Sequence, residues 1–249
     1  MLRELFRATR RSAPVSRLVA LVAAAAAGSF VPATQAAVIQ MTNGTTRVNG
    51  AEFVAGPVSI TDSASDALVR LQDKNHDGIE TGFNAPGIES VDTKPGSRAL
   101  RMAEMLPVKR GGQDFYALML DVNEPQGGGK NTISLDELKL YMSSDALTKG
   151  AAPSSLGSPV WNLDGAGSTD LMLADKTNGM GKADLALYLP AAAFRGAGSD
   201  EYVYVYSRFS SAEGGFESWL APAVAVPEPA GAMVVAGGAI AGLVVRRRK

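Results

Sequence analysis

The chain has 249 residues, no cysteine, one histidine (His76) and a formal net charge of −1. Without cysteine the fold has no disulfide and no catalytic thiolate, and a single histidine excludes zinc sites built from several histidines. The near-neutral total conceals an asymmetry. Without residues 1–36 and the four basic residues at the C-terminus, 15 basic and 24 acidic residues remain, a net charge of −9. This excess of acid argues against nucleic acid as a partner.

The N-terminal segment predicts a signal peptide. Five arginines precede residue 18, an apolar, alanine-rich run covers Leu18–Phe30, and small residues around Thr34–Ala37 fit cleavage after Ala36 or Ala37. We therefore expect residues 1–36 to form a signal helix that is removed on export. A permanent N-terminal anchor is the alternative, and the apolar run is short for it.

Residues 38–220 are expected to form the ectodomain. Up to about residue 60 the sequence predicts short strands, with turns at Asn43-Gly44 and Asn49-Gly50. Residues Ser63–Gln72 could form one short helix, because Ala67, Leu68 and Leu71 would share a face. Residues 80–97, rich in Gly, Pro and Asn, look irregular.

From residue 98 onward, apolar and polar residues alternate in several short segments. Alternation with a period of two residues indicates half-buried strands. The segments are Arg98–Met102, Phe115–Leu120, Leu138–Met142, Val160–Leu163, Leu171–Leu173, Leu185–Leu189 and Tyr202–Tyr206. Because turn-rich loops rather than long helices separate them, the sequence predicts an all-β ectodomain, an antiparallel β-sandwich or jelly roll.

One loop resembles the first half of an EF-hand. Asp73, Asn75 and Asp77 place oxygen ligands at loop positions 1, 3 and 5, Gly78 follows at position 6, and Ile79 would give its carbonyl at position 7. Position 12 falls on Asn84, which cannot bind calcium through a bidentate carboxylate. A weak calcium site and a plain turn therefore both remain open.

Other acidic residues are weaker candidates. Asp121-x-Asn123 with Ile133–Glu137 could be an interrupted calcium loop, although a strand-end turn fits the β pattern better. Asp164, Asp170 and Asp175 stand at predicted strand ends, where a sandwich can gather carboxylates around calcium, but Asp is also a common turn residue. The glycine-rich segment at residues 127–131 lacks the spacing of a phosphate-binding loop.

The sequence predicts no catalytic site. A Ser/His/Asp triad would have to use His76, and no nucleophile-elbow motif is present. The alternating tyrosines 202, 204 and 206, with Trp161 and Trp219, could stack on sugars, or the tyrosines could pack on a sheet face. We therefore expect a protein that is not an enzyme. A carbohydrate-binding module or a weak glycan-active enzyme is the alternative.

The C-terminus carries three features in a fixed order. A stiff spacer at residues 221–229 ends in Val226-Pro227-Glu228-Pro229. An apolar run of sixteen residues, Ala230–Val245, follows, and the chain ends in Arg246-Arg247-Arg248-Lys249. A helix of that length spans about 24 Å, slightly less than a hydrocarbon core of about 30 Å. Residues 230–249 therefore predict a transmembrane helix whose basic end stays in the cytoplasm.

This tail resembles the PEP-CTERM sorting signal of exported proteins of Gram-negative bacteria. The resemblance implies anchoring in the inner membrane, processing near Pro-Glu-Pro by an exosortase, and release toward the cell surface or extracellular matrix. The implied partners are the export machinery and the exosortase, with exopolysaccharide as a candidate. The other interpretation is a plain tail anchor, in which the prolines only end the ordered chain before the helix.

The ectodomain also resembles a type that often precedes such tails. The resembling segments are Leu120–Glu124, Ile133–Leu138, Leu163–Gly165, Tyr202–Ser207 and Gly215–Trp219. This resemblance implies no known activity, and it supports only the prediction of a single domain.

Overall fold

The computed structural model describes residues 36–59, 67–85, 92–94, 96–147, 152–165, 167–177 and 182–222. The predicted leader and the predicted sorting tail lie outside these residues, apart from Ala36 and the start of the spacer. Across the described ranges, no helix has the length and apolar character needed to cross a membrane.

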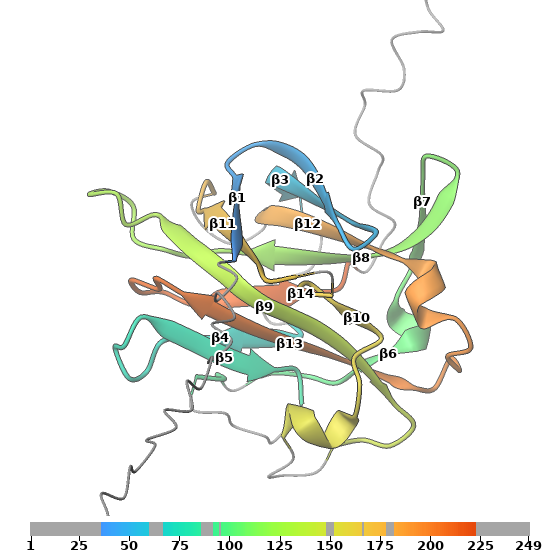
Figure 1. Cartoon of the computed structure of the whole chain (residues 1–249). Coiled ribbons are helices and arrows are strands. Elements are labelled where there is room, and N and C mark those ends of the chain that lie inside the picture. The colour runs from blue at the N-terminus through green and yellow to red at the C-terminus, as the bar shows by residue number, and fades with distance from the viewer. Residues whose placement is uncertain are drawn as a thin grey trace, which may run out of the picture. The chain divides into compact units, whose positions relative to one another are not determined.

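The described part of the chain is all-β and forms two seven-stranded sheets (Figure 1). Sheet A has the order β1-β11-β9-β13-β5, with β10 beside β9 and β6 beside β13. Its strands are β1 (Ala37–Met41), β5 (Ile79–Phe83), β6 (Leu100–Arg101), β9 (Thr132–Ser143), β10 (Trp161–Asn162), β11 (Thr169–Ala174) and β13 (Tyr202–Ser210).

Sheet B has the order β2-β3-β12-β8-β14-β4, with β7 beside β8. Its strands are β2 (Gly44–Val48), β3 (Ala51–Ser59), β4 (Val69–Leu71), β7 (Pro107–Arg110), β8 (Gln113–Asp121), β12 (Lys182–Pro190) and β14 (Glu217–Leu220). The described helices are three short 3₁₀ turns, η2 (Met102–Glu104), η3 (Pro153–Leu156) and η4 (Ala191–Phe194).

The main core lies between the two sheets. Sheet A contributes Leu138 and Val205, sheet B contributes Leu118 and Leu187, and all four side chains are fully buried in one cluster. Removing this apolar area from water is the main source of stability, because each buried Leu or Val contributes roughly 1.5–3 kcal/mol. The sandwich-like architecture therefore follows from the period-two pattern, which gives each strand one apolar face.

The pairing is antiparallel with one exception among the described strands, the parallel pair β1–β11. The β2–β3 hairpin shows how the local sequence sets an antiparallel register. Val48 faces Ala51, so Asn49 and Gly50 form a two-residue turn with φ of 49° and 78°. Positive φ at both positions is typical of a type I′ turn, which favours Asn-Gly.

Most of the strands predicted from alternation are confirmed, since the segments beginning at Phe115, Leu138, Leu171, Leu185 and Tyr202 lie within β8, β9, β11, β12 and β13. The predicted helix Ser63–Gln72 is wrong at Val69–Leu71, which form β4 and pair with β14. The prediction of an irregular chain from residue 80 is wrong at 80–83, which lie in β5 and pair with β13. In both cases pairing with a distant strand outweighs the weak local propensity.

Candidate functional site

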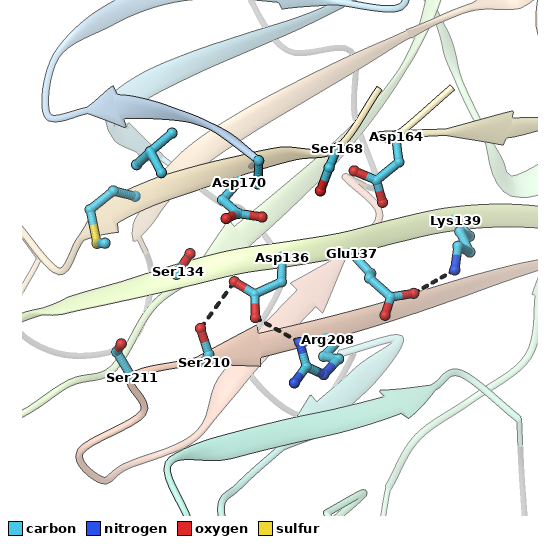
Figure 2. Close-up of a pocket in the computed structure, with 13 residues that line it drawn as sticks. Ser134, Asp136, Glu137, Lys139, Asp164, Ser168, Asp170, Arg208, Ser210 and Ser211 are labelled. Atoms are coloured by element: carbon cyan, nitrogen blue, oxygen red, sulfur yellow. Dashed lines mark hydrogen bonds and ion pairs between the residues drawn. The ribbon is translucent and has the colours of Figure 1, made fainter. Parts of the chain in front are cut away.

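A polar groove of about 650 Å³ lies on the outer face of sheet A, away from the main core (Figure 2). It lies over β9, between β11 and β13. Its lining residues are Ala36, Val38, Ser134, Asp136, Glu137, Lys139, Asp164, Ser168, Asp170, Met172, Arg208, Ser210 and Ser211. We call this feature the outer groove.

A β-bulge in β9 brings two acids to the floor of the outer groove. Arg208 of β13 faces Glu137, while the next residue, Phe209, faces Leu135, so Asp136 is the extra residue on β9. The inward positions change from Leu135 to Leu138 across the bulge. Asp136 and Glu137 therefore both face outward, as happens where a bulge redirects side chains.

Each of these acids has a basic partner. Asp136 accepts a hydrogen bond from Arg208 Nη1 at 2.8 Å and another from Ser210 Oγ at 3.0 Å. Glu137 pairs with Lys139, whose ammonium also lies 5.5 Å from the ring centre of Tyr206. Burial is the largest single effect and opposes the charged form of Lys139, but the hydrogen bond to Glu137 and the charge of that carboxylate together raise the pKa of Lys139. Both cations of the groove are therefore already engaged.

Asp164 and Asp170 approach the groove from the β11 side, opposite Arg208 and Ser210 (Figure 2). Asp164 accepts a hydrogen bond from the backbone N–H of Thr169 at 2.9 Å. Burial raises the pKa of Asp170, and the charges of Asp136 and Asp164 raise it further, against a smaller opposing effect of Arg208. With four carboxylates and two cations in its lining, the groove is net acidic and suits cations or ligands rich in hydroxyl groups.

The three aspartates predicted at strand ends, Asp164, Asp170 and Asp175, lie in two different parts of the fold. Asp164 and Asp170 share the outer groove, whereas Asp175 lies buried beside Asp121 and Asp184. Asp175 accepts hydrogen bonds from the backbone of Glu124 and Thr177, so backbone amides occupy its oxygens. Burial raises the pKa of Asp121 to about 7, with contributions from Asp184 and Asp175.

The predicted calcium loop joins β4 of sheet B to β5 of sheet A. The Asp73 carboxylate accepts hydrogen bonds from the backbone N–H groups of Asp77 (3.2 Å) and Gly78 (2.8 Å), and Asp77 Oδ1 accepts one from Ile79 (3.0 Å). Burial opposes ionisation of Asp73, yet the hydrogen bonds from the backbone of Gly78, Asp77 and His76 leave its pKa lowered. The loop is thus closed around an ionised carboxylate.

The remaining positions of the loop do not complete a metal site. Asn84, at position 12, is fully buried and bonds to the backbone of β13, donating to Val203 and accepting from Val205. In the ranges that the structure describes, no group of three or more His, Cys, Asp or Glu side chains is placed to hold a metal ion. Calcium at Asp73, Asn75, Asp77 and Ile79 stays a prediction.

Sequence reasoning missed a buried acid cluster formed by Glu80, Glu124 and Glu217. Their exposed fractions are 0%, 3% and 0%, the carboxyl groups of Glu80 and Glu217 hydrogen-bond to each other, and Oε1 of Glu124 has no hydrogen-bond partner. Burial and the neighbouring Glu80 raise the pKa of Glu217 well above its usual value. Burial likewise raises the pKa of Glu80, against the lowering effect of its hydrogen bonds to Glu217 and to the backbone N–H of Asp73. The cluster keeps protons that exposed carboxyls would lose, because a buried unpaired charge is costly.

The candidate sugar-stacking residues are largely covered. Trp219 is fully buried and its indole N–H bonds to Ser207 Oγ at 3.1 Å, and Trp161 is 5% exposed. Tyr204 is also fully buried, in a small apolar cluster on the outer face of sheet A that includes the half-buried Tyr202 and Tyr206. The tyrosines therefore fit the alternative of a packed sheet face better than an exposed platform.

Comparisons with models of protein families, with curated protein sequences and with solved structures find no match to this chain. The assignment of a role therefore depends on the sequence features and on the geometry described above.

Proposed function

We propose that this chain is an exported, non-enzymatic protein of the cell envelope or extracellular matrix. The observation that carries the proposal is the order of Val226-Pro227-Glu228-Pro229, the apolar run Ala230–Val245 and the final cluster Arg246–Lys249. This order matches a sorting signal that anchors the chain in the inner membrane until an exosortase processes it. The signal peptide at residues 1–36 directs the chain to the export machinery, as a C-terminal sorting signal requires.

In this proposal the β-sandwich or jelly-roll-like ectodomain has a structural or adhesive role. A hydrolytic triad would need His76, which belongs to the β4–β5 loop and does not line the outer groove. The acidic, solvent-facing groove suits a domain that contacts polar matrix components. Calcium, if bound at the Asp73 loop, would strengthen that loop at extracellular concentrations.

Cell fractionation tests the proposal with a matched pair of variants. We compare the wild type with Pro227→Ala/Glu228→Ala/Pro229→Ala and with the control Pro222→Ala, which changes a proline before the motif. The wild type and the control should reach the surface without the tail, and the triple variant should stay in the inner membrane with the tail attached. Equal surface release of all three, or a cytoplasmic wild type with an intact leader, would contradict the proposal.

A carbohydrate-binding role is the second candidate, and the outer groove is the observation that favours it. Unlike the covered aromatic residues, its carboxylates and serine hydroxyls are accessible to the hydroxyl groups of a polysaccharide. Asp164→Asn/Asp170→Asn should weaken binding of the mature protein to exopolysaccharide at least tenfold, whereas the exposed Asp200→Asn should not. If the wild type binds no exopolysaccharide, this candidate is eliminated and the structural role stands.

A further inference from the structure

The point at which the leader is predicted to be cut lies at the edge of the outer groove. Ala36 is one of the lining residues, and Ala37 is the first residue of β1. The backbone N–H of Ala37 donates to the carbonyl of Ser168 at 2.9 Å. Cleavage after Ala36 would turn this amide nitrogen into the α-amino group of the mature chain.

The register of the parallel pair β1–β11 places that nitrogen beside the start of β11, one residue before Asp170. Ala37 faces Thr169 and Val38 faces Asp170, so the new terminus lies at the end of β11 that carries Asp170. Ala36, Val38 and Asp170 all line the groove, because alternate residues of neighbouring strands point to the same face. The paired edge strand therefore holds the terminus beside the groove and restricts its motion.

The groove lacks a cation at this position. Arg208 is paired with Asp136 and Lys139 with Glu137, which leaves Asp164 and Asp170 without an ion pair among the described residues. The two unpaired acids stand on the β11 side, the same side as the Ala37–Ser168 hydrogen bond. An α-ammonium at Ala37 would bring one positive charge to the part of the groove where negative charge is in excess.

We propose that leader cleavage after Ala36 completes the outer groove, because the new α-ammonium of Ala37 binds there as the counter-ion of Asp170 and Asp164. The inference rests on the proposed export of the chain. Before cleavage the same nitrogen belongs to a neutral peptide bond and cannot neutralise either acid. Processing therefore adds an ion pair to the existing pairing of β1 with β11, and the uncut precursor lacks that ion pair.

The reactivity of the α-amine tests the inference on the full mature protein, purified from cells that export it. Only the deprotonated amine reacts with an acylating reagent, and an ordinary α-amino group has a pKa of about 7.7–8.0. A carboxylate partner that raises this pKa by about one unit slows labelling at pH 7 about tenfold. Mass spectrometry of the N-terminal peptide measures the labelling rate as a function of pH.

We expect the wild type to label about tenfold more slowly at pH 7 than the same protein unfolded in guanidinium chloride, with a midpoint at higher pH. Asp170→Asn should raise the labelling rate of the folded protein at pH 7 at least threefold. Asp164→Asn should also raise this rate, and Asp200→Asn should leave it unchanged. Simple steric cover would slow labelling without moving the midpoint. That result, or an unchanged rate in both groove variants, would overturn the inference.

The same spectra separate this inference from the proposed function. A chain that begins at Ala37 but labels like an ordinary amine leaves export intact and refutes the counter-ion role. A chain that begins at Val38 was exported yet lacks the Ala37 nitrogen, which also refutes it. A chain that keeps Met1 contradicts the proposed export itself.

Discussion

Replacing Glu124 by Gln should stabilise the protein at neutral and alkaline pH. Glu124 is 3% exposed and its Oε2 accepts a hydrogen bond from the backbone of Glu213 at 2.9 Å, while its Oε1 has no partner. Burial raises the pKa of this carboxyl to about 7, and the charges of Glu80 and Glu213 contribute. A glutamine keeps the shape and the accepting oxygen and carries no charge.

The magnitude follows from proton linkage. The pKa of Glu124 rises from 4.5 to about 7 on folding. Between these values the folded state holds a proton that the unfolded state has lost, so the free energy of unfolding falls as the pH rises through this window. At about 1.36 kcal/mol for each pH unit, the ionisable side chain costs up to about 3 kcal/mol above pH 7. The uncharged Gln avoids this cost.

Thermal and urea unfolding of the wild type and Glu124→Gln between pH 4.5 and pH 8 would measure the effect. At pH 8 we expect the variant to melt about 6–12 °C higher, since 1 kcal/mol corresponds to about 2–4 °C for a domain of this size. At pH 4.5 the two should be nearly equal, and Glu201→Gln, a control outside the cluster, should follow the wild type throughout. A variant that is less stable at pH 8, or a difference that does not change with pH, would refute the reasoning.

Three further predictions address single sites. Ser207→Ala should lower the free energy of unfolding by about 1–3 kcal/mol, because it leaves the buried indole N–H of Trp219 without an acceptor. Urea titrations measure this change, and an unchanged free energy of unfolding would show that the bond contributes nothing. Arg208→Ala should cost about 1 kcal/mol, since Asp136 loses its basic partner. If the ion pair is the cause, Arg208→Ala should cost little more when it is added to Asp136→Asn. The same loss in both backgrounds would exclude the pair as the cause. We expect calcium to bind with a Kd of about 10⁻⁴–10⁻³ M, and calcium at ten times the Kd should add about 1.4 kcal/mol to the free energy of unfolding. Asp77→Ala should lose most of this gain. Equal melting temperatures with EDTA and with millimolar calcium would mean that the loop is only a turn.

Local patterns were sufficient to predict the class of the fold. The alternation around Tyr202–Tyr206 reflects a strand with Val203 and Val205 in the main core and Tyr204 on the outer face. The turn at Asn49-Gly50 was predictable from the sequence, because its positive φ angles favour these residue types. Such features depend on neighbouring residues, so a single sequence reveals them.

Features that depend on distant partners were not predictable in the same way. β4 is only three residues long and exists because Val69 and Leu71 pair with β14, so its local sequence also suited a helix. Glu80 and Glu217 come from segments far apart in the chain and meet only in the folded state. Nothing in either local sequence indicates that the other acid will be its neighbour.

The candidate site falls between these two cases. The doublet Asp136-Glu137 interrupts the alternation of β9 between Leu135 and Leu138, and this break could have indicated the bulge. Asp164 and Asp170 were recognised as strand-end acids, but their meeting with β9 required the register of sheet A. The leader cleavage point was predicted from small residues alone, without any indication that it would lie in the same groove.

The masses of both termini of the mature protein, isolated from cells that naturally make it, test the central claim most directly. The account predicts a chain that begins at Ala37 and ends near Pro227-Glu228-Pro229, without the apolar run and the basic cluster. A chain that retains both Met1 and Lys249 would contradict it, because neither the leader nor the tail would then have been used.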